Sequence, residues 1–117
     1  LAQTIIVTAF GLNIPTKLTG LSTLKVKETD RIEALRNELT NLGASCIIDD
    51  ESIEFFKSNK LNKNYIINTY DDHRMALAFA PLSVIFPIEI QDPKVVSKSF
   101  PEFWNILEKL NFSIDFV

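Results

Sequence analysis

The feature that most constrains the fold is an amphipathic helix pattern that follows directly on a cluster of charged residues. Apolar residues recur at helical spacing from Ile32 to Leu42, and Gly43 supplies a stop. The pattern predicts a helix over residues 31–42. Because one face of this helix is apolar, that face must be buried against other elements of the chain.

The charged cluster reads Lys-Val-Lys-Glu-Thr-Asp-Arg over residues 25–31. Asp30, with Glu33 three residues later, is typical of a capping box, and either Asp30 or Thr29 is the expected cap. Lys27 and Arg31, however, lie at the positive end of the helix dipole, where carboxylates would be more stable. Cations at a helix start indicate that an anion is expected between them and the free backbone N–H groups.

Two further helix starts carry cations. The second, reading Thr-Tyr-Asp-Asp-His-Arg, puts His73 and Arg74 in its first turn. The third has Lys98 just before a predicted capping box of Ser99 and Glu102. Three such starts are either unrelated surface features or the walls of one polyanion site.

Composition excludes several classes of function. The chain has 117 residues, which suits one domain, and its net charge of −3 with a pI of about 5.1 does not indicate a nucleic-acid-binding surface. Cys46 is the only cysteine, and with a single histidine no metal-ligand spacing is present. Pro81 and Pro87 interrupt the most apolar stretch, so no membrane helix is expected, and no signal peptide is visible.

Periodicity and turn signals predict a mixed α/β chain. We expect a helix ended by Gly11, and a helix near the C-terminus that buries Phe103, Ile106, Leu107 and Leu110. If residues 25–27 are extended, Lys25 and Lys27 share one face. The predicted helices cover residues 2–11, 31–42, 72–84 and 102–110, and the predicted strands cover 16–19, 45–48, 52–56, 65–68, 88–90 and 112–116.

Three motifs carry a family resemblance. Lys-Glu-Thr-Asp-Arg at 27–31, Asp-His-Arg-Met-Ala at 72–76 and Asp-Pro-Lys…Lys-Ser-Phe-Pro at 92–101 resemble motifs of EPSP synthase, in the same order. The resemblance implies an α/β (α+β type) fold of β-α-β-α-β-β units, forming an inside-out barrel with helices inside and sheets outside. It also implies that residues 1–117 are a single partial domain, the C-terminal part of an EPSP synthase-like enzyme.

The resemblance implies an activity as well. EPSP synthase, the glyphosate target, is a cytoplasmic transferase of the shikimate pathway of aromatic amino acid biosynthesis. It moves the enolpyruvyl group of phosphoenolpyruvate to the 5-hydroxyl of shikimate 3-phosphate. No cofactor, metal, nucleic acid or membrane is implied, and the full-length enzyme is expected to be a monomer. The family's proton-transferring aspartate would stand immediately before Leu1, so we expect this chain alone to be inactive.

The resemblance assigns roles to named residues. Lys27 and Glu28 are the expected catalytic residues. Lys27 is also expected to bind shikimate 3-phosphate together with Thr23, which stands where many members carry asparagine. The residues expected to bind phosphoenolpyruvate are Arg31, His73, Arg74 and Lys98.

Less specific interpretations stay open. Lys27 and Glu28 are also compatible with a solvated surface ion pair, and Arg31 with a pair to a carboxylate on its own helix. The alternative functions are a sister enolpyruvyl transferase that acts on a UDP-sugar, and a non-catalytic β-α-β module that binds anions or RNA.

Overall fold

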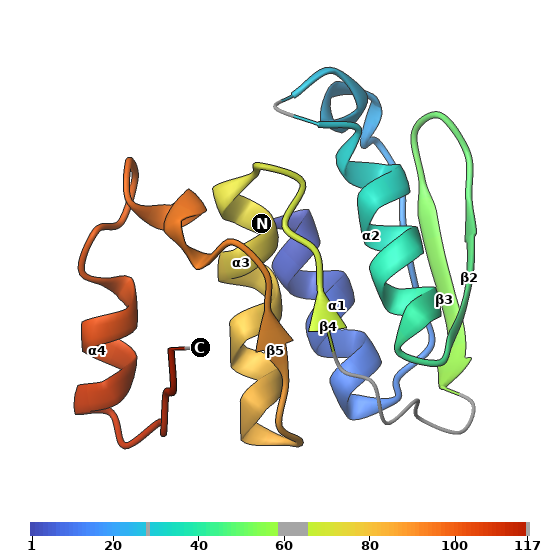
Figure 1. Ribbon diagram of the computed structural model, residues 1–117. Helices are drawn as coiled ribbons and strands as arrows, with labels where there is room; N and C mark the ends of the chain where they lie inside the picture. The colour runs from blue at the N-terminus through green and yellow to red at the C-terminus, as the bar shows by residue number, and fades with distance from the viewer. Residues whose placement is uncertain (28, 59–65, 117) are drawn as a thin grey trace.

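The structure, a computed structural model, describes residues 1–27, 29–58 and 66–116 (Figure 1). Its helices are α1 (Ala2–Leu12), α2 (Arg31–Asn41), α3 (His73–Phe79) and α4 (Phe103–Lys109), with 3-10 segments η1 (Ser22–Val26), η2 (Ala80–Val84) and η3 (Pro93–Val96). The strands are β1 (Thr16–Leu18), β2 (Ala44–Ile48), β3 (Ile53–Ser58), β4 (Ile66–Ile67) and β5 (Glu89–Ile90). No helix in these described ranges is long and apolar enough to cross a membrane.

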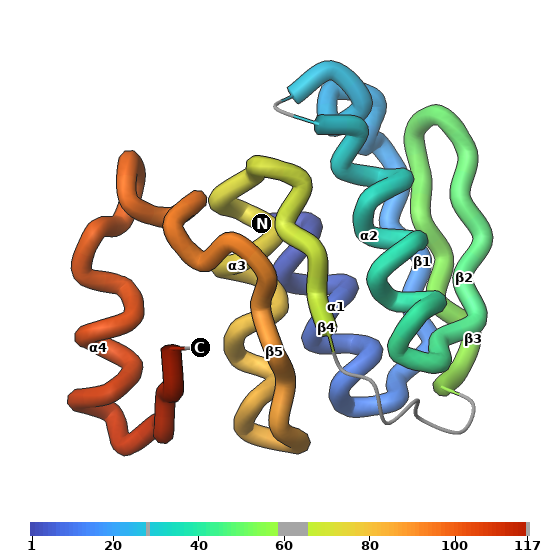
Figure 2. The backbone as a smooth tube through the Cα atoms, viewed as in Figure 1, coloured from blue at the N-terminus to red at the C-terminus, as the bar shows by residue number. Residues whose placement is uncertain are grey.

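The strands form two small sheets. In the first, β3 lies between β1 and β2 and pairs antiparallel with both, with Phe55 opposite Thr16 on one side and Cys46 on the other. In the second, β4 and β5 pair in parallel and are connected through α3 (Figure 2). The structure therefore confirms a mixed α/β chain.

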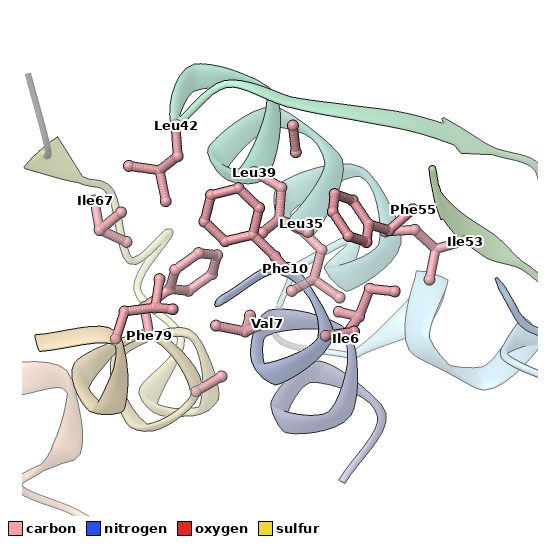
Figure 3. Packing of buried hydrophobic residues seen from close by; sticks show 14 of the residues in the cluster. Ile6, Val7, Phe10, Leu35, Leu39, Leu42, Ile53, Phe55, Ile67 and Phe79 are labelled. Carbon is pink, nitrogen blue, oxygen red and sulfur yellow. The ribbon is translucent and has the colours of Figure 1, made fainter. Parts of the chain in front are cut away.

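One hydrophobic core joins the helices to the first sheet. Apolar side chains of α1, α2, α3 and β3 converge, and Phe10 meets Phe55 edge to face at a centroid distance of 5.9 Å (Figure 3). Leu35 and Leu39 of the predicted apolar stripe are fully buried there. Burial of each such side chain stabilises the fold by about 1.5–3 kcal/mol.

The helices start at a common end of the molecule. Figure 1 shows α1, α2 and α3 beginning at its upper end, while β4 and β5 run in the opposite direction. The segments that contain the first two motifs, at the starts of α2 and α3, therefore meet at one end. The turn that follows η3, which contains Lys98, lies at the same end.

Two expectations for the N-terminal half differ from the structure. Helix α1 continues past Gly11 and ends at Asn13, whose φ of 55° is left-handed. Gly11 instead permits close packing, because a Cβ there would lie 2.9 Å from Ile85 Cδ1. Residues 22–26 form the 3-10 segment η1 rather than an extended piece, and Lys25 pairs with Asp50 at 2.7 Å. The lysines at 25 and 27 therefore do not lie on one strand face.

The C-terminal predictions also need correction. The helix predicted over 72–84 changes to 3-10 geometry at Ala80, next to Pro81, which cannot donate a backbone hydrogen bond. Helix α4 forms, but none of its residues is fully buried. Residues 112–116 alternate as expected of a strand, yet they form none, since no described strand pairs with them.

Candidate anion-binding site

The first two motifs are joined by a buried ion pair. Arg31, the first residue of α2, donates from Nε to Asp72 Oδ2 at 2.7 Å and from Nη2 to Asp72 Oδ1 at 3.2 Å. Both side chains are almost completely buried. A paired guanidinium and carboxylate of this geometry are held in a fixed orientation. The pair spans 41 residues of sequence, so it fixes the start of α3 against the start of α2.

Both helix starts are capped by aspartates. Asp30 accepts a hydrogen bond from the Glu33 backbone N at 3.1 Å, which confirms the predicted cap of α2. Asp72 accepts from the Arg74 backbone N at 2.9 Å while it also holds Arg31. The cap of α3 is thus also a partner of the arginine at the start of α2, which adds a long-range pair that the sequence did not predict.

A buried carboxylate of α2, that of Glu38, holds the loop that precedes α3. Glu38 accepts from the Asn68 backbone N at 2.8 Å and from Tyr70 Oη at 2.6 Å. Tyr70 and Asp71 both have left-handed backbone angles, with φ of 56° and 54°. Burial and the hydrogen bond to Glu38 raise the pKa of Tyr70 to about 12, so its hydroxyl stays a donor at neutral pH.

The third motif is connected less directly. Thr69 Oγ1 donates to the Gln91 carbonyl at 3.0 Å, which links the loop before α3 to the chain just before η3. The predicted capping box of Ser99 and Glu102 does not form: α4 begins at Phe103, and its N-cap Glu102 makes no side-chain cap hydrogen bond. The third helix start is therefore built differently from the other two.

The structure places the predicted site residues at different depths. Arg31 is buried and His73 is half-buried, whereas Thr23, Lys27, Arg74 and Lys98 are exposed. The ion pair brings the motifs of Arg31 and Arg74 together, while no described hydrogen bond joins Lys98 to them. Glu28, the predicted proton-transferring carboxylate, lies outside the described residues.

Sequence reasoning missed two residues of this site. Asp72 was not predicted as a partner of Arg31. Glu38 offered a signal that was not used: a glutamate at the centre of the apolar stripe, between Leu35 and Leu42, is unusual because buried carboxylates need partners.

A cavity elsewhere in the described chain does not include these residues. It has a volume of about 800 Å³ and lies between η2, β5 and the C-terminal segment. Its charged lining consists of Glu89, Asp92 and Asp115, with no cation. A cavity whose only charged lining side chains are carboxylates repels a phosphate, so the candidate anion site remains at the helix starts. Among the described residues, no group of three or more His, Cys, Asp or Glu side chains is placed to hold a metal ion.

Comparison with known proteins identifies the family of this chain. The sequence profile of EPSP synthase (3-phosphoshikimate 1-carboxyvinyltransferase) matches residues 1–107, which is most of the chain. The chain belongs to the EPSP synthase family. This assignment confirms the resemblance that the three motifs carry.

Individual EPSP synthases agree with the profile. The 3-phosphoshikimate 1-carboxyvinyltransferase of Bacteroides fragilis strain YCH46 is 48% identical over 117 residues, covering 97% of this chain and 28% of its own length. That of Neisseria meningitidis serogroup B is 37% identical, with 93% and 25% covered. The EPSP synthase structure from Acinetobacter baumannii matches with a TM-score of 0.78 at 27% identity, over 92% of this chain and 26% of that one. The chain thus spans about a quarter of the length of these EPSP synthases.

Proposed function

We propose that this chain supplies one wall of the active site of a 3-phosphoshikimate 1-carboxyvinyltransferase. The carrying observation is the buried pair of Arg31 and Asp72, which fixes two cationic helix starts against each other. Helix N-termini with arginines bind phosphates and carboxylates, and phosphoenolpyruvate has both groups.

In this proposal each binding residue contacts one of the two substrates. Arg31, His73, Arg74 and Lys98 bind phosphoenolpyruvate, and Thr23 with Lys27 binds shikimate 3-phosphate. The exposed positions of Arg74 and Lys98 leave their side chains accessible to a ligand, which supports the assignment. Threonine reaches less far than asparagine, so the contact from Thr23 is expected to be the weaker one.

The reaction proceeds by addition and elimination. The 5-hydroxyl oxygen attacks C2 of phosphoenolpyruvate while C3 gains a proton and the hydroxyl loses one, which gives a tetrahedral intermediate. The intermediate then loses phosphate from C2 and a proton from C3, which restores the double bond between C2 and C3 and yields the enol ether product. Glu28 and Lys27 are the proposed proton-transferring pair, and the surrounding cations stabilise the charge that develops on the phosphate.

The finer architecture belongs to the proposal as well. We place residues 1–117 in one partial domain of an inside-out barrel with helices inside and sheets outside. We place the complete enzyme in the cytoplasm as a monomer. The isolated 117-residue chain is expected to show no turnover, because one wall of a cleft lacks the opposing residues.

A chimera tests the proposal. These 117 residues replace the matching segment of the Bacteroides fragilis enzyme, and release of phosphate from phosphoenolpyruvate and shikimate 3-phosphate is measured. We expect turnover, and we expect Arg74→Lys to lower kcat/KM by about 100-fold because lysine cannot form two parallel bonds to a carboxylate or phosphate.

A lysine of the third motif provides a second test, and a lysine of α4 provides its matched control. Lys98→Gln is expected to raise the KM for phosphoenolpyruvate, whereas Lys109→Gln, an exposed lysine of α4, is expected to leave it unchanged. A folded chimera without turnover, or equal effects of the two lysine substitutions, would count against the proposed site.

A further inference from the structure

Helix α2 carries two buried ionic side chains on one face. Arg31 and Glu38 are seven residues apart, which is about two helical turns and about 10 Å along the axis. Both are at least 96% buried, since their exposed fractions are 4% and 1%. The hydrogen bonds described for these two side chains reach the short segment 68–72 between β4 and α3.

The two side chains hold opposite ends of that segment. Glu38 accepts hydrogen bonds from the Asn68 backbone N and from the Tyr70 hydroxyl. Arg31 donates to Asp72 at the end of the segment. Thr69 is buried between them, and its hydroxyl donates to the Gln91 carbonyl. The segment is therefore fixed at both ends and in the middle.

The backbone of the segment requires such support. Tyr70 and Asp71 are consecutive residues with left-handed φ angles, and tyrosine has none of the freedom of glycine in that region. Backbone strain of this kind persists only where the surrounding contacts impose it. The residues that follow directly are Asp72, His73 and Arg74, so the direction of this turn sets where the start of α3 lies.

Glu38 has no other evident purpose in the core. An apolar residue would suit its position between Leu35 and Leu42, because a buried carboxylate loses its hydration. Its described hydrogen bonds are not within α2 but with the segment before α3. The Tyr70 hydroxyl, whose pKa is raised to about 12, remains protonated and donates to it.

We infer that Glu38 is a positioning residue that, through Asn68 and Tyr70, holds the left-handed turn which sets the phosphoenolpyruvate-binding start of α3. The inference rests on the proposed function, and it adds a residue that touches neither substrate. Loss of Glu38 is expected to weaken the binding of phosphoenolpyruvate selectively, because Thr23 and Lys27 lie on a different segment.

The test uses the chimeric enzyme with Glu38→Gln and, separately, Tyr70→Phe. Glu38→Gln keeps the size of the side chain but removes its charge, and Tyr70→Phe removes one donor while Glu38 and Asn68 stay. We expect the KM for phosphoenolpyruvate to rise about tenfold in the first variant and about threefold in the second. The KM for shikimate 3-phosphate is expected to change less than twofold.

The control is Glu108→Gln, the same chemical change at an exposed position of α4, which is expected to leave both KM values unchanged. Should Glu38→Gln not fold, Tyr70→Phe decides. Unchanged KM values with only a lower unfolding temperature would assign Glu38 a merely structural role and overturn the inference. An inactive but folded chimera without any substitution would instead overturn the proposed function, and the inference with it.

Discussion

At the scale of single residues, the Arg31–Asp72 pair is the buried contact that joins the two helix starts of the candidate site. Two charges buried together are tolerated because each satisfies the other, but a single charge left behind is not. The same aspartate also caps α3, so its side chain serves two structural requirements at once.

We expect Asp72→Ala to lower the free energy of unfolding by about 3–5 kcal/mol, because the Arg31 guanidinium would stay buried without this partner and α3 would lose its cap. Urea denaturation of the 117-residue chain measures the change. Asp50→Ala removes the exposed pair with Lys25 and should leave the midpoint unchanged. Similar shifts of the urea midpoint for both substitutions would show that burial of the Arg31–Asp72 pair does not determine its contribution to stability.

Cys46 provides a second residue-scale prediction. Burial raises the pKa of its thiol to about 11 from an ordinary value of 9.0. Only the thiolate is nucleophilic, so at pH 8 the rate of alkylation should be about 100-fold below that of an exposed thiol. The rate should rise tenfold per pH unit up to about pH 11. Iodoacetamide labelling followed by mass spectrometry measures it, and rapid labelling of folded chain at pH 8 would contradict the assignment.

At the scale of elements, the caps explain which helix starts are well defined. The start of α2 has its predicted aspartate cap, whereas α4 begins without a side-chain cap although Ser99 and Glu102 have capping-box spacing. Capping-box spacing alone does not determine whether a cap forms. Turns within residues 97–102 lead into α4, and the helix begins only at Phe103, after both Ser99 and Glu102.

Two matched substitutions test this difference. Asp30→Ala is expected to destabilise the chain by about 1 kcal/mol, since it removes the hydrogen bond to the Glu33 backbone N. Ser99→Ala is expected to have almost no effect, because Ser99 caps no helix here. Thermal unfolding followed by circular dichroism compares the two, and a clear loss in Ser99→Ala would restore the predicted capping box.

At the scale of the whole molecule, the part predictable from sequence is the part that forms the core. The stripe from Ile32 to Leu42 was predicted and is buried. The site was predicted through its motifs, but the pairing of Arg31 with Asp72 was not, because sequence spacing carries no information about which distant partner a buried charge meets. The residues at 112–116 have strand-like alternation, but a strand also needs a neighbour with free backbone groups.

The core and the C-terminal segment should differ in stability. None of the residues of α4 is fully buried, whereas α1, α2 and α3 each contribute several fully buried side chains. We expect amide hydrogens of α4 to exchange roughly a hundredfold faster than those of α2 in the 117-residue chain. Hydrogen–deuterium exchange with mass spectrometry resolves the two helices. Equal protection would mean that α4 unfolds only together with the core.

One hydrogen bond allows the stability of α4 to be followed by fluorescence. Trp104, the only tryptophan of the chain, sits half-buried on α4 and donates from Nε1 to the Pro93 carbonyl at 3.0 Å. Its fluorescence therefore reports the contact of α4 with η3, while the far-ultraviolet dichroism is dominated by the other helices. Trp104 is therefore an intrinsic fluorescent probe for the separation of α4 from η3, the segment that precedes Lys98.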